Sequence, residues 1–241
     1  MSSIDNSAIR LICFPHAGGS SRTYIPWKQY ASFLEIVTVP LPGRNFPTGS
    51  QTPTNFAELS EALMHHVRQM VNGVPYALFG HSMGALLAYE VTRLIEKAAA
   101  RLPMAVFVSG CRSPQRWTQH GCRSSWTDSY ILSNLVELGG TPKELVEHKE
   151  MREILLPILR YDYAMIDSYV YKHTDALRSS IGVLGGLEDA DVTLEDLNGW
   201  LQLSCGRTQL KTFSGGHFFL NSEMKEVVTF VERFLDIERG V

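Results

Sequence analysis

One short stretch of this chain has the residue types and spacing of a nucleophilic centre. Gly80-His81-Ser82-Met83-Gly84 matches the pattern G-x-S-x-G, which is typical of a nucleophile elbow. In such an elbow a tight turn strains the serine, and small residues two before and two after it avoid backbone clashes. An apolar run precedes the pattern and an amphipathic helical pattern follows it, as the motif requires. The sequence therefore predicts Ser82 as a catalytic nucleophile; the alternative is a glycine-rich turn with a buried serine.

A serine hydroxyl is a poor nucleophile without a base, and His217 is the predicted base. This histidine lies in Ser214-Gly215-Gly216-His217-Phe218-Phe219, directly after the last predicted strand. The two glycines allow the loop backbone to approach the elbow closely. The alternative is a surface histidine in a loop.

The acid that orients the histidine should follow the strand expected at residues 181–184, since the chain order in this motif class is serine, acid, histidine. The loop after that strand carries Glu188, Asp189 and Asp191. Asp189 lies three residues after Gly186 and three before Val192, and we predict it as the acid. Asp191 is the first alternative and Glu188 the second.

An oxyanion hole needs two backbone N–H donors. One donor in this motif class is the residue after the nucleophile, here Met83. The other should come from the loop after the first strand, Pro15-His16-Ala17-Gly18-Gly19, and we predict the Ala17 N–H. We expect His16 to shape this loop rather than to take part in catalysis.

Short apolar runs predict the strands that position these residues, at 9–14, 36–39, 76–79, 104–108, 181–184 and 207–213. Amphipathic runs predict helices at 56–71, 86–95, 193–203 and 221–235, with Thr193 and Asn221 as caps of the last two. Strands that alternate with helices indicate an α/β protein with a mostly parallel central sheet. Together with the elbow, this pattern predicts an α/β-hydrolase fold.

The alternation stops between residues 113 and 174, where helical patterns prevail. We therefore predict a helical lid insertion at 113–176 within a core formed by 1–112 and 177–241.

Composition excludes several classes of function. The 241 residues are 44% hydrophobic, which is enough for a sizeable core. A formal charge of -3 gives no reason to expect nucleic acid or an anionic membrane as a partner. Four cysteines without metal-binding spacing indicate reduced thiols and a cytoplasmic protein. No apolar run approaches the length of a membrane span, and no signal peptide is visible.

No metal or cofactor site is predicted either. His65 and His66 are adjacent on an expected helix, so they point to different faces and make a poor metal pair. The glycine pairs Gly18-Gly19 and Gly185-Gly186 lack the spacing of nucleotide-binding motifs.

The chain resembles the type II thioesterases, the separate editing hydrolases of nonribosomal peptide and polyketide synthesis. The resemblance runs along nearly the whole chain, and the pairing of P-H-A-G-G with G-H-S-M-G is specific. It rests on Phe14-Pro15-His16-Ala17-Gly18-Gly19-Ser20, Pro40-Leu41-Pro42-Gly43-Arg44, Phe79-Gly80-His81-Ser82-Met83-Gly84-Ala85, Ser109-Gly110, Leu156-Pro157 to Asp162-Tyr163, and Gly215-Gly216-His217-Phe218-Phe219-Leu220.

This resemblance implies hydrolysis of acyl groups from the phosphopantetheine arm of acyl or peptidyl carrier proteins. We expect the protein to be a monomer. The insertion would cover the acyl pocket, and apolar or aromatic residues of the insertion are candidates for its lining: Trp117, Trp126, Leu135, Met165 and Tyr169. Core packing is the alternative for each of them. Four arginines are candidates for contact with an acidic carrier, with solvated charges as the alternative: Arg22, Arg44, Arg112 and Arg116.

Two other functions stay open at this point. One is a small-molecule carboxylesterase or lipase on the same fold. The other is a catalytically silent fold that binds carriers, against which the complete set of triad residues argues.

Overall fold

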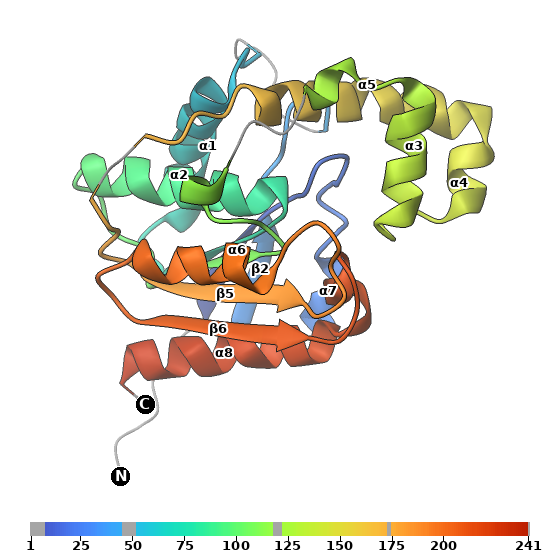
Figure 1. The fold of residues 1–241 in the computed structure, drawn as a ribbon. Helices are drawn as coiled ribbons and strands as arrows, with labels where there is room; N and C mark the ends of the chain where they lie inside the picture. Colours follow the sequence, from blue (N-terminus) through green and yellow to red (C-terminus); the bar gives the residue numbers. More distant parts are fainter. Residues whose placement is uncertain (1–7, 45–51, 118–121, 173–174, 241) are drawn as a thin grey trace.

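The central element is a six-stranded sheet in which every neighbouring pair of strands is parallel. It is seen in a computed structural model that describes residues 8–44, 52–117, 122–172 and 175–240. The strand order is β2-β1-β3-β4-β5-β6 (Figure 1). The strands are β1 Ile9–Phe14, β2 Leu34–Thr38, β3 Tyr76–His81, β4 Ala105–Ser109, β5 Ser180–Gly186 and β6 Thr208–Phe213.

Helices cover both faces of the sheet, which explains why every residue of β1 except Arg10 is apolar. Side chains alternate between the faces of a strand, so Ile12 and Phe14 pack in one core while Leu11 and Cys13 pack in the other. The first core includes α1 (Phe56–Val71) and α2 (Met83–Lys97). The second includes the 3-10 helix η1 (Ile25–Gln29) and α8 (Met224–Arg239), which lies beneath the sheet in Figure 1.

Two predicted helices are divided in the structure. The segment expected at 193–203 forms α6 (Leu194–Asn198) and the 3-10 helix η4 (Gly199–Gln202), and Thr193 caps α6 as predicted. The segment expected at 221–235 forms α7 (Phe219–Ser222) and α8. Asn221 is wrong as the cap, because it lies inside α7 and Glu223 stands at the N-cap of α8.

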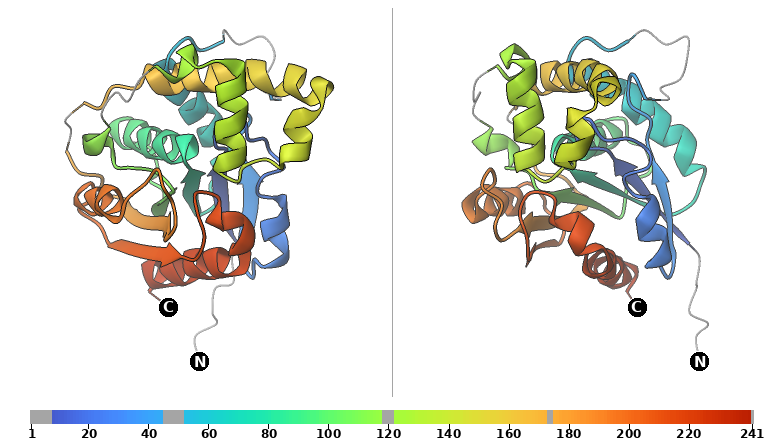
Figure 2. Two further views of the ribbon diagram at one scale, coloured as in Figure 1. Left: turned by 45° about the vertical axis from the view of Figure 1, so that its right-hand side comes forward. Right: turned by 90° about the vertical axis from the view of Figure 1, so that its right-hand side faces the viewer.

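Helices fill the chain between β4 and β5. They are η2 Pro114–Arg116, η3 Arg123–Ser125, α3 Asp128–Glu137, α4 Lys143–Glu147 and α5 Lys149–Asp167. In Figures 1 and 2 the helices α3, α4 and α5 stand beyond the carboxyl ends of the strands. In parallel α/β sheets that edge is where ligands bind, because the loops that follow the strands gather there.

Candidate active site

Ser82 lies at the turn between β3 and α2, in a backbone conformation that few residues adopt. Its φ is 55° and its ψ is −120°. A Cβ atom on Gly80 would lie 1.9 Å from the Gly84 carbonyl oxygen, and one on Gly84 would lie 2.2 Å from the Phe14 carbonyl oxygen. Both positions therefore require glycine, as the motif predicts, and the tight turn presents the serine at the carboxyl edge of the sheet.

His217 and Asp189 form a buried pair beside this turn. The Nδ1 atom of His217 lies 2.8 Å from Oδ2 of Asp189, and the two side chains are 7% and 1% exposed. Of the three candidate carboxylates, Asp189 is thus the one that binds the histidine. Its other oxygen accepts a hydrogen bond from the backbone N–H of Asp191 at 2.9 Å, so both carboxylate oxygens are held. Glu188 is exposed.

The loops that carry this pair are in direct backbone contact. A Cβ on Gly186 would lie 2.3 Å from the Gly216 carbonyl oxygen, so the close approach depends on glycine. The Glu188 N–H donates to the Gly215 carbonyl oxygen at 3.0 Å. The glycines of the two loops thereby fix the acid and the histidine relative to each other.

Two further histidines surround the imidazole of His217. The ring centroid of His81 lies 5.0 Å from that of His217, and His16 packs against Phe218. Burial lowers the pKa of His81 well below its ordinary value. Burial, with smaller contributions from His217 and Arg44, lowers the pKa of His16 to about 3. Both rings are therefore neutral at pH 7, which fits the structural role expected for His16.

The predicted oxyanion donors both border the same cavity as Ser82. Met83 is the first residue of α2, so its N–H has no partner four residues earlier within the helix. Ala17 lies in a turn that is closed by a hydrogen bond of 2.9 Å from the Gly19 N–H to the His16 carbonyl oxygen. Gly18, at the third position of this turn, has a φ of +76°, as in a type II turn.

Asp162, a residue that the sequence did not reveal as part of the site, holds this turn in place. Its Oδ2 accepts a hydrogen bond from the Gly18 N–H at 2.7 Å. The guanidinium of Arg44 donates to both carboxylate oxygens, at 2.7 and 2.9 Å. Burial raises the pKa of Asp162 although Arg44 and Gly18 act in the opposite direction. The pair is buried, and Arg44 as a contact for a carrier protein is therefore wrong.

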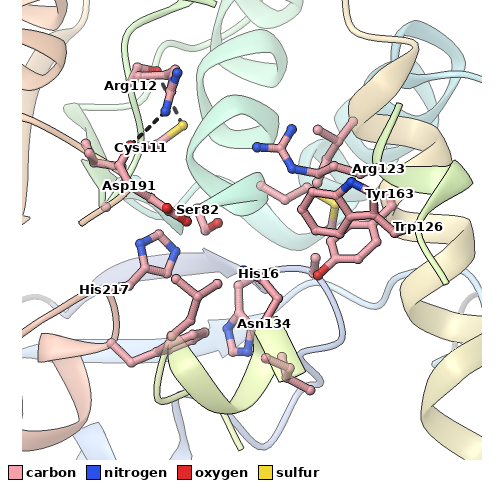
Figure 3. Close-up of a pocket in the computed structure, with 18 of the residues that line it drawn as sticks. His16, Ser82, Cys111, Arg112, Arg123, Trp126, Asn134, Tyr163, Asp191 and His217 are labelled. Carbon is pink, nitrogen blue, oxygen red and sulfur yellow. Dashed lines mark hydrogen bonds between the residues drawn. The ribbon is translucent and has the colours of Figure 1, made fainter. Parts of the chain in front are cut away.

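A cavity of about 450 Å³ opens at Ser82 and His217 and reaches under the helices that follow β4 (Figure 3). Three of the five residues predicted to line the acyl pocket border it: Trp117, Trp126 and Leu135. Met165 and Tyr169 do not and pack in the core instead; the Tyr169 hydroxyl donates to Glu90 at 2.9 Å. Core packing is thus the correct interpretation for those two residues.

The other predicted arginines have different surroundings. Arg112 borders the cavity and donates to the backbone carbonyl of Asp191 at 2.7 Å. Arg116 forms ion pairs with Glu195 and Asp196 on α6, at 2.8 and 2.9 Å. Arg22 is exposed at a second cavity of about 350 Å³, which shares His16 and Ala17 with the first.

Cys111 also borders the main cavity, as a possible second nucleophile. Burial raises the pKa of its thiol to about 12, so the thiol stays protonated at pH 7. Ser82 is therefore the better candidate for the attacking group.

The described residues contain neither a cluster of metal-binding side chains nor a helix that could span a membrane. Within 8–44, 52–117, 122–172 and 175–240, no group of three or more histidine, cysteine or acidic side chains is placed to hold a metal ion. In those same ranges, every helix is too short or too polar to cross a bilayer.

Comparison with known proteins places this geometry in a family. The model of the thioesterase domain matches residues 9–235. The gramicidin S biosynthesis protein GrsT of Aneurinibacillus migulanus is 33% identical over 230 residues, which cover 94% of this chain and 89% of that protein.

Solved structures agree with this match. The type II thioesterase BorB from the borrelidin biosynthetic cluster superposes with a TM-score of 0.83 at 33% identity, over 94% of this chain and 92% of that one. ClbQ from the colibactin pathway superposes with a TM-score of 0.88 at 27% identity, over 97% and 99%. The predicted α/β-hydrolase fold is confirmed. On these matches the chain belongs to the thioesterase family, among the type II thioesterases.

Proposed function

We propose that this protein is a serine thioesterase that hydrolyses acyl thioesters carried on the phosphopantetheine arm of carrier proteins, with Ser82, His217 and Asp189 as its triad. The observation that carries the proposal is the buried Asp189–His217 pair at the cavity where the strained Ser82 turn ends. The relatives support the choice of substrate, because BorB is a type II thioesterase of a biosynthetic cluster and ClbQ belongs to a combined NRPS/PKS pathway.

In the first half of the reaction, the Ser82 hydroxyl attacks the thioester carbonyl carbon while Nε2 of His217 takes its proton. Asp189 accepts the hydrogen bond from Nδ1, which fixes the tautomer that leaves Nε2 free to act as the base. The imidazolium then protonates the departing pantetheine sulfur, and the acyl group remains on Ser82. A thiol leaves more readily than an amine because its pKa is far lower.

The backbone N–H groups of Ala17 and Met83 stabilise the negative charge that develops on the carbonyl oxygen. Each such donor is worth roughly 10² to 10³ in rate in enzymes of this type. In the second half, His217 activates water, which attacks the acyl-serine ester and releases the free acid.

The carrier's arm reaches the serine through the second cavity, which is bordered by Gly18, Gly19 and Ser20 and meets the main cavity at His16 and Ala17. Arg22 stands exposed at this cavity, where it meets the acidic surface of the carrier. The acyl chain occupies the main cavity. No resident cofactor enters the scheme, because the pantetheine belongs to the substrate.

The test compares acyl-carrier thioesters with simple oxygen esters, for the wild type and for Ser82→Ala. We expect a preference for carrier thioesters, and a rate lower by a factor of roughly 10⁴ or more in the variant. A fluorophosphonate probe should label the wild type on the peptide that contains Ser82, and circular dichroism should show that the variant is folded. A clear preference for free oxygen esters would establish the carboxylesterase alternative. Substantial activity in folded Ser82→Ala would mean that another group attacks.

A further inference from the structure

The main cavity contains a guanidinium group that the proposed reaction does not use. Arg123, the first residue of η3, borders the cavity together with Ser82 and His217. In Figure 3 its guanidinium group projects into the cavity from the side of Trp126 and Tyr163. In this view Ser82 lies between His217 and the guanidinium group of Arg123.

Aromatic rings hold this cation in place. The guanidinium carbon lies 5.8 Å from the ring centroid of Trp117 and 5.9 Å from that of Trp126. The backbone N–H of Arg123 donates to Asp167 at the end of α5, at 3.1 Å, which anchors the start of η3. Indole faces attract a cation without using its N–H groups. The planar set of donors therefore stays available to a ligand.

Arg123 differs in this respect from its neighbours in the insertion. Arg116 is paired with Glu195 and Asp196, and Arg160 is paired with Asp128. The Arg123 side chain has neither an ion pair nor a hydrogen bond to any residue of the described segments 8–44, 52–117, 122–172 and 175–240.

The surroundings of this guanidinium favour an anionic ligand. Trp117, Trp126 and Tyr163 provide apolar walls. The other charged residues at the cavity are one cation, Arg112, and one acid, Asp191, so Arg123 adds an unbalanced positive charge. Burial raises the pKa of Tyr163 to about 12, so its hydroxyl stays neutral at pH 7. Between apolar walls, hydrogen bonds from a charged donor are stronger than in water. A guanidinium matches a carboxylate best, because its N–H donors bind both oxygens at once.

We propose that Arg123 binds a carboxylate at the distal end of the acyl group, so that the enzyme prefers carboxyacyl thioesters, the half-thioesters of dicarboxylic acids. This inference rests on the proposed thioesterase function and adds the class of acyl group. The acyl pocket is then a selective site in which apolar walls bind the methylene chain and Arg123 recognises its end.

The test uses pairs of acyl-carrier thioesters that have the same shape but differ in end group. Glutaryl is compared with 5-methylhexanoyl, in which an isopropyl group replaces the carboxylate, and malonyl and succinyl pairs vary the chain length. The readout is the ratio of kcat/KM values within each pair. We expect the carboxyacyl member to be preferred for at least one chain length.

Variants at Arg123 locate the source of that preference. In Arg123→Gln the ratio should fall about tenfold to a hundredfold, because hydrogen bonds between charged partners are lost. Arg123→Lys keeps the charge but not the planar set of N–H donors, so its ratio should lie between that of the wild type and that of Arg123→Gln. The matched control is Arg68→Gln, which removes one positive charge from the exposed side of α1 and should keep the wild-type ratio.

Three outcomes are distinguishable. If neutral acyl groups are hydrolysed as fast as carboxyacyl groups or faster, the inference is wrong while the thioesterase proposal stands. If no carrier thioester is hydrolysed, the proposed function itself fails. If carboxyacyl groups are preferred but Arg123→Gln keeps both the ratio and a folded state by circular dichroism, another group recognises the carboxylate and the assignment to Arg123 is overturned.

Discussion

Two buried carboxylates support the site from different parts of the molecule, and their partners differ in kind. Asp189 follows β5 in the sheet core and binds His217, a ring that can gain and lose a proton. Asp162 belongs to α5, between β4 and β5, and binds Arg44, which stays charged, together with the Gly18 N–H. Both carboxylate side chains are 1% exposed.

This difference in partners predicts different consequences when each carboxylate is removed. In the proposed reaction Asp189 acts on a group that moves protons, so its loss should change the rate of the chemical step. Asp162 acts on a turn and on a permanent charge, so its loss should change stability first and rate second. Variants at Asp189, Asp162 and Arg44 test this division.

The largest effect is expected for Asp189→Asn. An amide in place of the carboxylate favours the wrong tautomer of His217, so kcat should fall by about 10⁴ with little change in the midpoint of thermal unfolding. Steady-state kinetics on a carrier thioester and a thermal melt measure the two quantities. The matched control is Asp191→Asn, which alters a carboxylate two residues away that borders the same cavity, whereas the hydrogen bond of His217 goes to Asp189; it should keep kcat within a few-fold of the wild type. The reverse order of the two variants would move the acid to Asp191.

Asp162→Ala should affect stability more than the substitutions at Asp189 and Asp191. Arg44 would be left buried without a counter-charge, and breaking such a pair costs about 3–5 kcal/mol of unfolding free energy. The turn with Ala17 and Gly18 would lose its acceptor, so kcat should fall by roughly 10 to 10² with a smaller change in KM. Urea titration and steady-state kinetics check the two effects.

A double variant separates these two roles of Asp162. Arg44→Met with Asp162→Leu replaces the ion pair by apolar groups and should recover most of the lost stability. It should not recover kcat, because the Gly18 N–H still has no acceptor. Full recovery of kcat would show that Asp162 contributes through stability alone.

The smallest expected effect is on the pH dependence of stability, and it comes from His81, the histidine beside His217. His81 stays neutral in the folded protein because burial lowers its pKa, whereas in the unfolded chain it takes up a proton below about pH 6.5. The unfolded state then binds more protons, so the unfolding free energy decreases as pH falls, by up to about 1.4 kcal/mol per pH unit for this histidine. His81→Gln should remove that part of the slope between pH 6.5 and 4.5 in urea titrations. The control His65→Gln, at an exposed position of α1, should keep the wild-type slope. Equal slopes in the wild type and in His81→Gln would show that His81 does not cause this pH dependence.

Local patterns explain how much of the site the sequence could predict. The elbow is one continuous motif, and its glycines are required by contacts within a few ångströms. The chain order of the motif class led to His217 and to a single loop with three carboxylates. The spacing of Asp189 from Gly186 and Val192 favoured it over Asp191 and Glu188, and in the structure Asp189 is the one that binds His217. The bounds of β1 were predicted without error because an apolar strand that is buried on both sides shows clearly in the sequence.

The Asp162 pair could not be found in this way. Its partners lie 118 and 144 residues away along the chain, and no local pattern connects positions so distant. One signal was present: Asp162 shares a helix face with Leu159 and Ile166, both buried, and a charge on an apolar face needs a partner. Arg44 was mistaken for a surface residue because its burial depends on that distant partner.

The hydrogen bond from Gly18 to Asp162 also limits how this enzyme could be re-engineered. Exchanging the helices between β4 and β5 for those of another hydrolase would replace more than the wall of the acyl cavity, since α5 carries the acceptor for the turn beside Ser82. A chimera that changes substrate range would have to retain Asp162 with Arg44, or introduce a new acceptor for Gly18 at the same place.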